Sequence, residues 1–493
     1  MQDLLPHYER ELAVLRNQTR EFAQRYPKIA SRLQLSGESS EDPHVERLIE
    51  SFAFLAARVH KRIDDDFPLF TESLLEVLYP HYLRPFPSCS IAQFRLGSAA
   101  AQMSEPARVP RGEVLKSRPL GGVACQFRTA YDVDLLPVRL AQAEFRMALR
   151  TPTGTRWPSG TTAVVSLRFE SLSPQFSLAS LAGRTLRVYL DGEPSMVSAL
   201  REALCAQSLG VLLEPGDGLP WSGPHPERPN VVGFEDNQAL IEQDARSHPA
   251  YRLLTEYFAF PDKFNFIDLP WPGRASAAGQ PAPLWRSATL HVPLKGLRAD
   301  SDAARLLEGL EPSHLQLGCT PVVNLFRTPA DPIRVTHTRT TYPVLVDARR
   351  AHAYEVCAVT RVWRVRQTAQ GERAEEFRPF YSLRHDDLAA GDTAARYWYT
   401  ERDSSLAQRS PGHEVEIGLV DSEFHPGQAM HETLSLEVLA TNRDLPTQLA
   451  IAQPGGDLSI EGGSVAKEIH LLRKPSPCHR FERGEGALWR LIS

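Results

Sequence analysis

The spacing of apolar residues changes near residue 90, and this change constrains the fold more than any other feature of the sequence. Before that point apolar residues recur every three or four positions, and after it they alternate. A period near 3.6 belongs to helices that bury one face, whereas a period of two belongs to strands buried on one side. We therefore predict an α+β protein, with an N-terminal helical domain followed by β-rich mixed domains.

The first predicted helix carries one stripe of apolar and aromatic residues at alternating spacings of four and three. We interpret this stripe as a candidate partner-binding surface, because aromatic knobs with coiled-coil spacing dock onto other helices. The alternative is that the stripe packs on the chain's own second helix. Its candidate binding residues are Tyr8, Leu12, Leu15, Phe22 and Tyr26.

A second helix is predicted to begin at Asp42, which is a good N-cap, followed by Pro43 at the first helical position. Its apolar face is wide. The face consists of Val45, Leu48, Ile49, Phe52, Leu55, Ala56, Val59 and Ile63.

Turn-rich segments divide the rest of the chain. A Pro/Gly-rich loop at 215–229 marks a boundary, a mixed helical and strand pattern follows it, and strands dominate again from about residue 335. The predicted domains are a helical domain 1–88, a β-rich domain 89–230, a mixed α/β central domain 231–345 and a β-rich domain 346–493.

Composition argues against several classes of partner. With 55 basic and 60 acidic side chains the chain has no broad positive field, so we expect no nucleic-acid partner. No apolar run approaches the roughly 20 residues of a membrane span, so we expect no membrane insertion.

The six cysteines are scattered without a Cys-x-x-Cys pair, which favours buried thiols in a reducing compartment. The predicted location is the cytoplasm.

Signatures of catalysis were not found. The sequence has no phosphate-binding glycine loop, no dinucleotide fingerprint and no nucleophile elbow. His431 and Glu432 begin like a zinc-protease motif, but Ser435 stands where the second histidine is required. We predict no catalytic, cofactor-binding or metal-binding residue, and we interpret the chain as a protein that is not an enzyme.

Other polar and aromatic clusters are given ordinary interpretations. The acidic run 64–66, one turn after His60, is predicted to be a solvated turn, since no glycine-rich loop wraps it around a cation. His413, His425 and His431 are interpreted as surface or loop residues. An aromatic cluster in the middle of the chain is expected to lie in the core. It comprises Tyr251, Tyr257, Phe258, Phe260, Phe264 and Phe266.

Several long segments resemble one known family. The chain is similar to TssF proteins (also called VasA or ImpG), which are baseplate subunits of the bacterial type VI secretion system. The similar segments are PHYERELAVLRNQTREFAQRYP (6–27), DPHVERLIESFAFLAARVHKRIDDDFP (42–68), LLEVLYPHYLRPFPS (74–88), HPAYRLLTEYFAFPDKFNFIDL (248–269), CTPVVNLF (319–326) and LSLEVLATNRDLP (434–446).

The resemblance implies a structural role without cofactors. Proteins of this family pair with TssG, two copies to one, and join TssK and TssE in a wedge complex. Wedges surround the VgrG hub at the cytoplasmic side of the inner-membrane complex and form the platform for sheath and tube assembly. The resemblance therefore implies TssG, TssK, TssE and VgrG as partners, and self-association within the wedge.

The end of the chain departs from the family pattern. Members of the family normally continue beyond the segment 480–493 with a further domain, and the apolar residues Leu488, Trp489, Leu491 and Ile492 have no evident partner segment. We therefore expect a C-terminal part to be missing. Two other functions stay open: a β-rich cell-wall hydrolase with a helical extension, and an adaptor unrelated to secretion.

Overall fold

The structure is a computed structural model, and it divides the chain into two compact units. Unit 1 comprises residues 1–84 and 480–493, and unit 2 comprises residues 85–479. The residues that the structure describes are 4–36, 39–40, 42–64, 68–147, 155–216, 219–243, 247–273, 283–336, 338–368, 371–380, 396–421, 432–463, 465–481 and 487–492.

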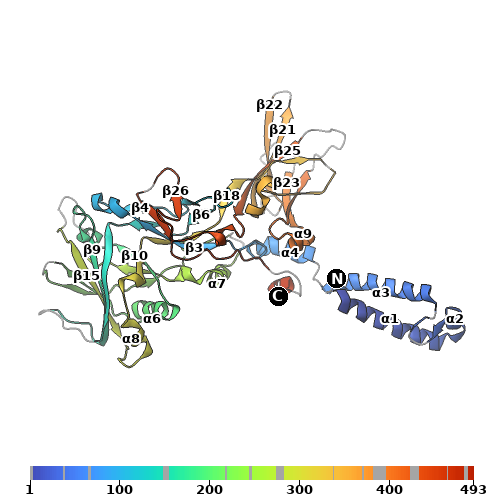
Figure 1. The fold of residues 1–493 in the computed structure, drawn as a ribbon, viewed down its shortest axis with the longest axis horizontal. Coiled ribbons are helices and arrows are strands. Elements are labelled where there is room, and N and C mark those ends of the chain that lie inside the picture. The colour runs from blue at the N-terminus through green and yellow to red at the C-terminus, as the bar shows by residue number, and fades with distance from the viewer. Residues whose placement is uncertain are drawn as a thin grey trace, which may run out of the picture. The chain divides into compact units, whose positions relative to one another are not determined.

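Unit 1 is helical, as the period near 3.6 predicts. Two long helices, α1 and α3, lie side by side (Figure 1). Pro6 stands in the first turn of α1, and Asp42 caps α3 by accepting a 2.8 Å hydrogen bond from the amide of His44. The elements of this unit are α1 (Leu5–Arg25), α2 (Pro27–Arg32), β1 (Leu35–Ser36), β2 (Ser39–Ser40), α3 (Pro43–Asp64), α4 (Pro68–Leu78), α5 (Pro80–Leu83) and α10 (Ala487–Ile492).

The last helix, α10, packs on α4 within unit 1. Leu488 is buried with Leu75 and Leu83, and the rings of Trp489 and Phe70 have their centroids 6.0 Å apart. The expectation that the apolar end of the chain lacks a partner segment is therefore wrong. Sequence reasoning missed this contact because the two helices are some 400 residues apart in the chain.

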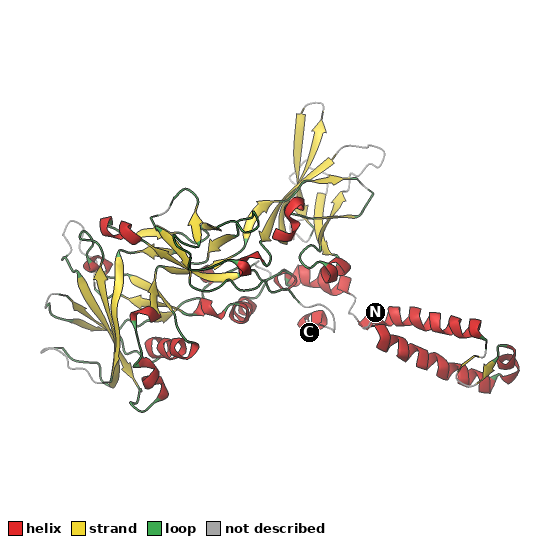
Figure 2. Ribbon diagram, in the orientation of Figure 1, coloured by secondary structure: helices red, strands yellow, loops and turns green. Residues whose placement is uncertain are grey.

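Unit 2 is built mainly from strands (Figure 2). A small closed barrel is filled by buried side chains such as Phe94, Leu115 and Phe127. Its neighbouring strands are, in order, β17 (Cys319–Val323), β3 (Cys89–Arg95), β27 (Glu468–Leu471), β26 (Leu458–Ile460), β5 (Val114–Ser117) and β6 (Gln126–Thr129). Beside these strands, β4 (Ala107–Val109) pairs with β7 (Val133–Leu135).

Two further sheets share the largest apolar core with helices α6 (Pro194–Cys205) and α8 (Asp302–Leu307). Alternating residues of the strands face this core, as the period of two predicts. One sheet has the order β12 (Ser222–His225), β11 (Val211–Pro215), β15 (Ser287–Lys295), β9 (Thr161–Ser171), β8 (Val138–Arg146). The other has the order β13 (Asn230–Val231), β14 (Phe266–Pro270), β10 (Thr185–Leu190), β16 (Leu315–Leu317).

The last large sheet has its own core, around Trp398, Val362 and Leu436. Its order is β18 (Phe326–Pro329), β25 (Glu432–Thr441), β21 (Glu355–Thr368), β22 (Gly371–Pro379), β23 (Arg396–Arg402), β24 (Val415–Asp421), β20 (Thr341–Pro343), and β19 (Ile333–Val335) also pairs with β25. The helix α9 (Ser404–Arg409) lies between β23 and β24 in the sequence. The α+β class is confirmed.

A buried pair of asparagines joins the barrel to this last sheet. Asn324 donates a 2.9 Å hydrogen bond to the side-chain oxygen of Asn442, and the amide of Asn442 donates one of 2.7 Å to Asn324. Asn324 also donates to the carbonyl of Gln126 in β6, at 2.7 Å. Both asparagines belong to segments that resemble the TssF family, so these two segments meet in the structure at a polar contact.

We predict that Asn442→Ala lowers the free energy of unfolding by about 2–4 kcal/mol, because it leaves several buried polar groups without a partner. Asn230→Ala, at an exposed position of β13, is the matched control and should change it by less than about 0.5 kcal/mol. Urea unfolding followed by tryptophan fluorescence measures both. Equal effects of the two variants would contradict the role given to the asparagine pair.

The aromatic cluster around helix α7 (Pro249–Ala259) divides into two sets. The prediction of core positions is confirmed for Phe260, Phe264 and Phe266, which are buried. It is wrong for Tyr251, Tyr257 and Phe258, which are exposed. The reason is that α7 turns its charged residues, Arg252 and Glu256, inward.

Candidate partner-binding surface on the helical hairpin

Helices α1 and α3 form an antiparallel hairpin held by a mixed seam. The rings of Tyr8 and Phe54 meet edge to face with centroids 6.4 Å apart. At one end Arg16 pairs with Glu46 at 3.0 Å, and elsewhere along the seam the ring of His60 lies 2.6 Å from a carboxylate oxygen of Glu11. Such half-exposed ion pairs contribute little stability. The close approach of the helices therefore depends chiefly on packing.

Alanines on α3 allow that close approach. Ala53 and Ala57 are completely buried, and they lie four residues apart, one turn along the same face. Small side chains let the backbone of α1 come near without leaving a cavity. The two fully buried positions of α3 are thus alanines, on the face that also carries the half-buried Val45 and Ile49.

The predicted stripe on α1 has two different environments. Tyr8, Leu12 and Leu15 are half-buried, whereas Phe22 and Tyr26 are 37% and 45% exposed. The last two rings lean on each other with centroids 5.3 Å apart. Packing on the second helix therefore accounts for part of the stripe. Partner binding by these five residues stays a prediction.

The outer face of α3 carries the four most exposed large apolar side chains among the described residues of the hairpin. Leu48, Phe52, Leu55 and Val59 are 71%, 61%, 56% and 58% exposed. Their spacing of four, three and four residues is the heptad spacing of a coiled-coil seam. We call these four residues the α3 ridge. Burying them against another helix would stabilise a complex by roughly 5 kcal/mol.

Sequence reasoning did not identify the α3 ridge as an exposed surface, although it found the wide apolar face that contains it. A face as wide as that of α3 is more than one neighbouring helix can cover. α1 covers the side with the alanines, so the large residues are left outside. The width of the apolar face of α3 was the sequence feature that could have indicated the exposed ridge.

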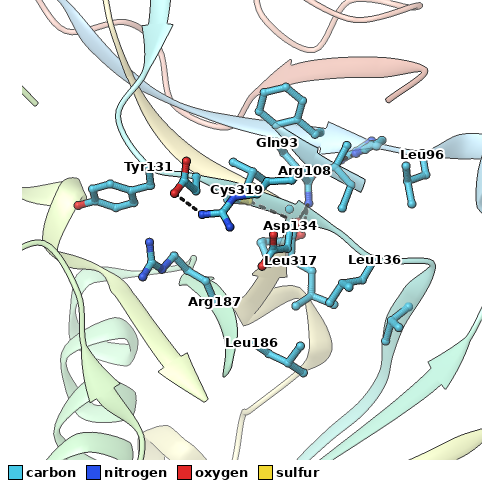
Figure 3. A pocket seen from close by; sticks show the side chains of 18 of the residues that line it. Gln93, Leu96, Arg108, Tyr131, Asp134, Leu136, Leu186, Arg187, Leu317 and Cys319 are labelled. Carbon is cyan, nitrogen blue, oxygen red and sulfur yellow. Dashed lines mark hydrogen bonds and ion pairs between the residues drawn. The ribbon is translucent and has the colours of Figure 1, made fainter. Parts of the chain in front are cut away.

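Unit 2 contains a pocket of about 770 Å³ where the barrel strands, β8 and β10 come together (Figure 3). Two of its acidic groups are engaged: Asp132 pairs with Arg108 and accepts a 2.8 Å hydrogen bond from the amide of Arg111, and Asp268 pairs with Arg187 at 2.8 Å. The bond from that amide is the main cause that lowers the pKa of Asp132. A glycosidase acid requires a raised pKa, so Asp132 does not suit the cell-wall hydrolase hypothesis.

A serine, a histidine and a glutamate lie in a row on neighbouring strands of unit 2. A nitrogen of His291 lies 3.0 Å from the carboxylate of Glu214, which can only accept a hydrogen bond, so the hydroxyl of Ser166 donates to the other nitrogen at 2.8 Å. The ring of Trp221 stacks on His291 with centroids 4.3 Å apart. This row ties β9, β15 and β11 together under an aromatic cover. Sequence reasoning missed it because no local motif brings the three strands together.

The remaining candidates for metal chemistry have other partners or fall outside the described residues. His413 donates a 2.9 Å hydrogen bond from Nε2 to the carbonyl of Ala351, and its Nδ1 shares a hydrogen bond of 2.9 Å with the hydroxyl of Ser410. His425 and His431 lie outside the described residues, as does most of the run 64–66. In the part of the chain that the structure describes, no three His, Cys, Asp or Glu side chains are grouped to hold a metal ion.

The cysteines and the helices of the described residues were also the subject of predictions from the sequence. Five of the six cysteines are buried and all six are free, and burial raises the pKa of Cys125 to about 11. None of the described helices has both the length and the apolar character needed to cross a membrane. The hairpin, the multi-sheet unit 2 and the exposed ridge are typical of a protein that works through contacts with other proteins.

Comparison with known proteins agrees with this description. The family model for the type VI secretion system protein TssF matches residues 1–493. The type VI secretion system component TssF1 of Pseudomonas aeruginosa is 32% identical over 506 residues, which cover 99% of this chain and 79% of that protein.

Two solved structures are similar in fold. A chain of the TssK-TssF-TssG baseplate subcomplex of the type VI secretion system matches with a TM-score of 0.66 and 27% identity, over 91% of this chain and 77% of the other. A chain of the type VI secretion baseplate complex matches with a TM-score of 0.51 and 25% identity, over 96% of this chain and 77% of the other.

These findings define the class first: this is a component of the bacterial type VI secretion machinery. Within that class the match over the whole chain is decisive, and the chain belongs to the TssF family. The resemblance seen in the sequence segments is thereby confirmed.

For the hairpin we predict that a substitution on the inner face of α3 lowers stability, whereas one on its outer face leaves stability nearly unchanged. Ala57→Asp places a charge in the seam and should lower the free energy of local opening of α1 and α3 by about 3 kcal/mol. Phe52→Ser, on the exposed ridge, should change it by less than about 0.5 kcal/mol, since Phe and Ser have similar helix propensity. Hydrogen exchange of the helix amides measures both. A large loss of protection in Phe52→Ser would contradict the exposed position of the ridge.

The buried His291 predicts a stability that depends on pH. Burial lowers its pKa in the folded state below the ordinary value of about 6.5. As the pH falls below that value, the unfolded state binds a proton that the folded state does not, so the free energy of unfolding falls. Urea unfolding between about pH 7.5 and pH 5 should show a steeper loss in the natural chain than in His291→Gln. Parallel curves would refute this assignment.

Proposed function

We propose that this chain builds the baseplate by binding TssG-like and TssK-like subunits, with the hairpin as its main contact to the TssG-like partner. As a member of the TssF family, the chain has a structural role in the type VI secretion baseplate. The related structure that contains TssK, TssF and TssG supports the choice of partners.

The single observation that carries the proposal is the α3 ridge. Four large apolar side chains with heptad spacing stand exposed on a helix whose other face is already packed on α1. A surface of this kind binds the apolar stripe of another helix, which completes a bundle. A rigid hairpin also costs little conformational entropy when it binds, because its shape is set before the partner arrives.

The finer arrangement rests on the family resemblance. We propose two copies of this chain for each TssG-like subunit, with further contacts to a TssE-like subunit, to the VgrG hub and between the two copies. The assembly would work on the cytoplasmic side of the inner-membrane complex. Its action would be mechanical, since interfaces that have two alternative packings can hold one state until firing rearranges them.

We predict that the chain co-purifies with a TssG-like protein when the two are expressed together, at two copies to one. The double variant Phe52→Asp/Leu55→Asp should abolish this association, because two charges would enter an apolar seam. Affinity purification followed by native mass spectrometry measures both the association and the stoichiometry.

The control is Val114→Asp/Leu172→Asp, which changes two exposed apolar residues of unit 2. It should leave the association intact. Clean separation of the natural chain from its co-expressed partner on a sizing column, with the chain folded, would refute the proposed function. Retained association in the ridge variant would refute the ridge as the contact.

A further inference from the structure

Helix α7 in unit 2 buries its charged residues and exposes its large apolar residues. Its charged residues, Arg252 and Glu256, are 4% and 2% exposed, whereas Leu254 and Phe258 are 54% and 80% exposed. A surface helix ordinarily does the opposite and turns its apolar stripe toward the core. The inward orientation of the charged residues of α7 must therefore have a physical cause.

The cause is a buried ion cluster that sets the rotation of the helix. The carboxylate of Glu256 binds the ammonium of the fully buried Lys263 and also accepts a 2.7 Å hydrogen bond from the amide of Leu240. Arg252 donates to the carbonyl of Phe234 at 2.9 Å and to Asp236 at 3.2 Å. Turning α7 over would leave Lys263 buried without its carboxylate, which costs several kcal/mol.

The consequence is a cluster of exposed apolar side chains around one buried ring. The exposed rings of Tyr257 and Phe258 have their centroids 5.5 Å apart, and Tyr257 and Phe234 both contact the buried ring of Phe264, at 5.9 Å and 5.1 Å. Tyr257 and Phe234 are 54% and 49% exposed. What we call the α7 face consists of the exposed residues Phe234, Tyr251, Leu254, Tyr257 and Phe258. A contiguous exposed patch of large apolar side chains marks an interaction site.

Three exposed acidic residues lie beside the α7 face. Glu235, Asp236 and Glu242 lie on the segment that runs along α7, and Asp236 already pairs with Arg252. Three arginines near α7 and this segment also have partners. Arg111 donates to the carbonyl of Ala239 at 3.1 Å, Arg201 donates to the carbonyl of Phe264 at 3.3 Å, and Arg473 pairs with Asp262 at 3.2 Å.

The charges decide which occupant fits. A second copy of the chain, bound face to face, would set acidic rim against acidic rim, and an anionic membrane would meet the same repulsion. A helix with an apolar stripe between lysines or arginines would instead gain electrostatic complementarity at its edges. The α7 face is therefore suited to a basic, amphipathic helix from a different protein.

We propose that the α7 face is a second docking surface, which binds a basic amphipathic helix of another subunit of the same complex. The inference rests on the proposed function, because it takes its partner from the same complex. It is independent of the hairpin, which belongs to the other unit. Each unit would then carry its own contact with the partner proteins.

The test measures the affinity of the full-length chain for the purified TssG-like and TssK-like subcomplex by biolayer interferometry. The double variant Leu254→Ser/Phe258→Ser should weaken binding by about tenfold or more, as expected for central apolar residues of an interface. The matched control is Leu284→Ser/Val465→Ser, at exposed apolar positions of unit 2 outside the α7 face, and it should bind within about twofold of the natural chain.

A charge variant provides a second readout. Glu242→Lys should weaken binding at low salt, and the difference from the natural chain should vanish near 1 M salt, where charges are screened within about 3 Å. Unchanged affinity in both the face variant and the charge variant would overturn the inference while leaving the proposed function intact.

Two further results would also overturn it. One is dimerisation of the isolated chain, seen by sedimentation velocity and lost in the face variant. The other is binding of the isolated chain to vesicles of anionic lipid, lost in the same variant. If the natural chain and the control both fail to bind the subcomplex, the proposed function and this inference fail together.

Discussion

Small or charged residues occupy the inner faces of helices α3 and α7, and large apolar residues are therefore left outside. On α3 the buried positions are alanines, which bring α1 close and leave Phe52 and Leu55 exposed. On α7 the ion cluster around Glu256 turns Phe258 toward solvent. In both cases the contacts inside the chain are well satisfied. The exposed surfaces are thus features of the fold itself, and we propose that partner subunits cover them.

Much of the architecture could be predicted from the sequence because it depends on local patterns. Period and capping located α3 correctly, with Asp42 and Pro43 at its start, and alternation indicated that strands dominate after residue 90. Contacts between distant segments could not be predicted in this way. The packing of Leu488 on α4, the pair of Asn324 with Asn442 and the row that contains His291 all join elements that are far apart in the chain.

The two surfaces that we propose for partner binding were predicted only in part, for a physical reason. Periodicity shows which residues share a face of a helix, but it does not show whether that face points inward. On α7 the ordinary rule that aromatic residues are buried failed. The buried ammonium of Lys263 is stabilised by the carboxylate of Glu256, and this ion pair sets the rotation of the helix. The charged residues Arg252, Glu256 and Lys263 at spacings of four and seven were the available signal.

Hydroxyl-radical footprinting with mass spectrometry tests the central claim most directly, because it reports the solvent exposure of individual side chains. The account predicts that Phe52 and Phe258 react readily in the isolated chain and become protected in the complex with the TssG-like and TssK-like subunits. Exposed residues away from both faces, such as Leu284, should keep their reactivity. Equal reactivity of Phe52 and Phe258 in the isolated chain and in the assembled complex would contradict the account.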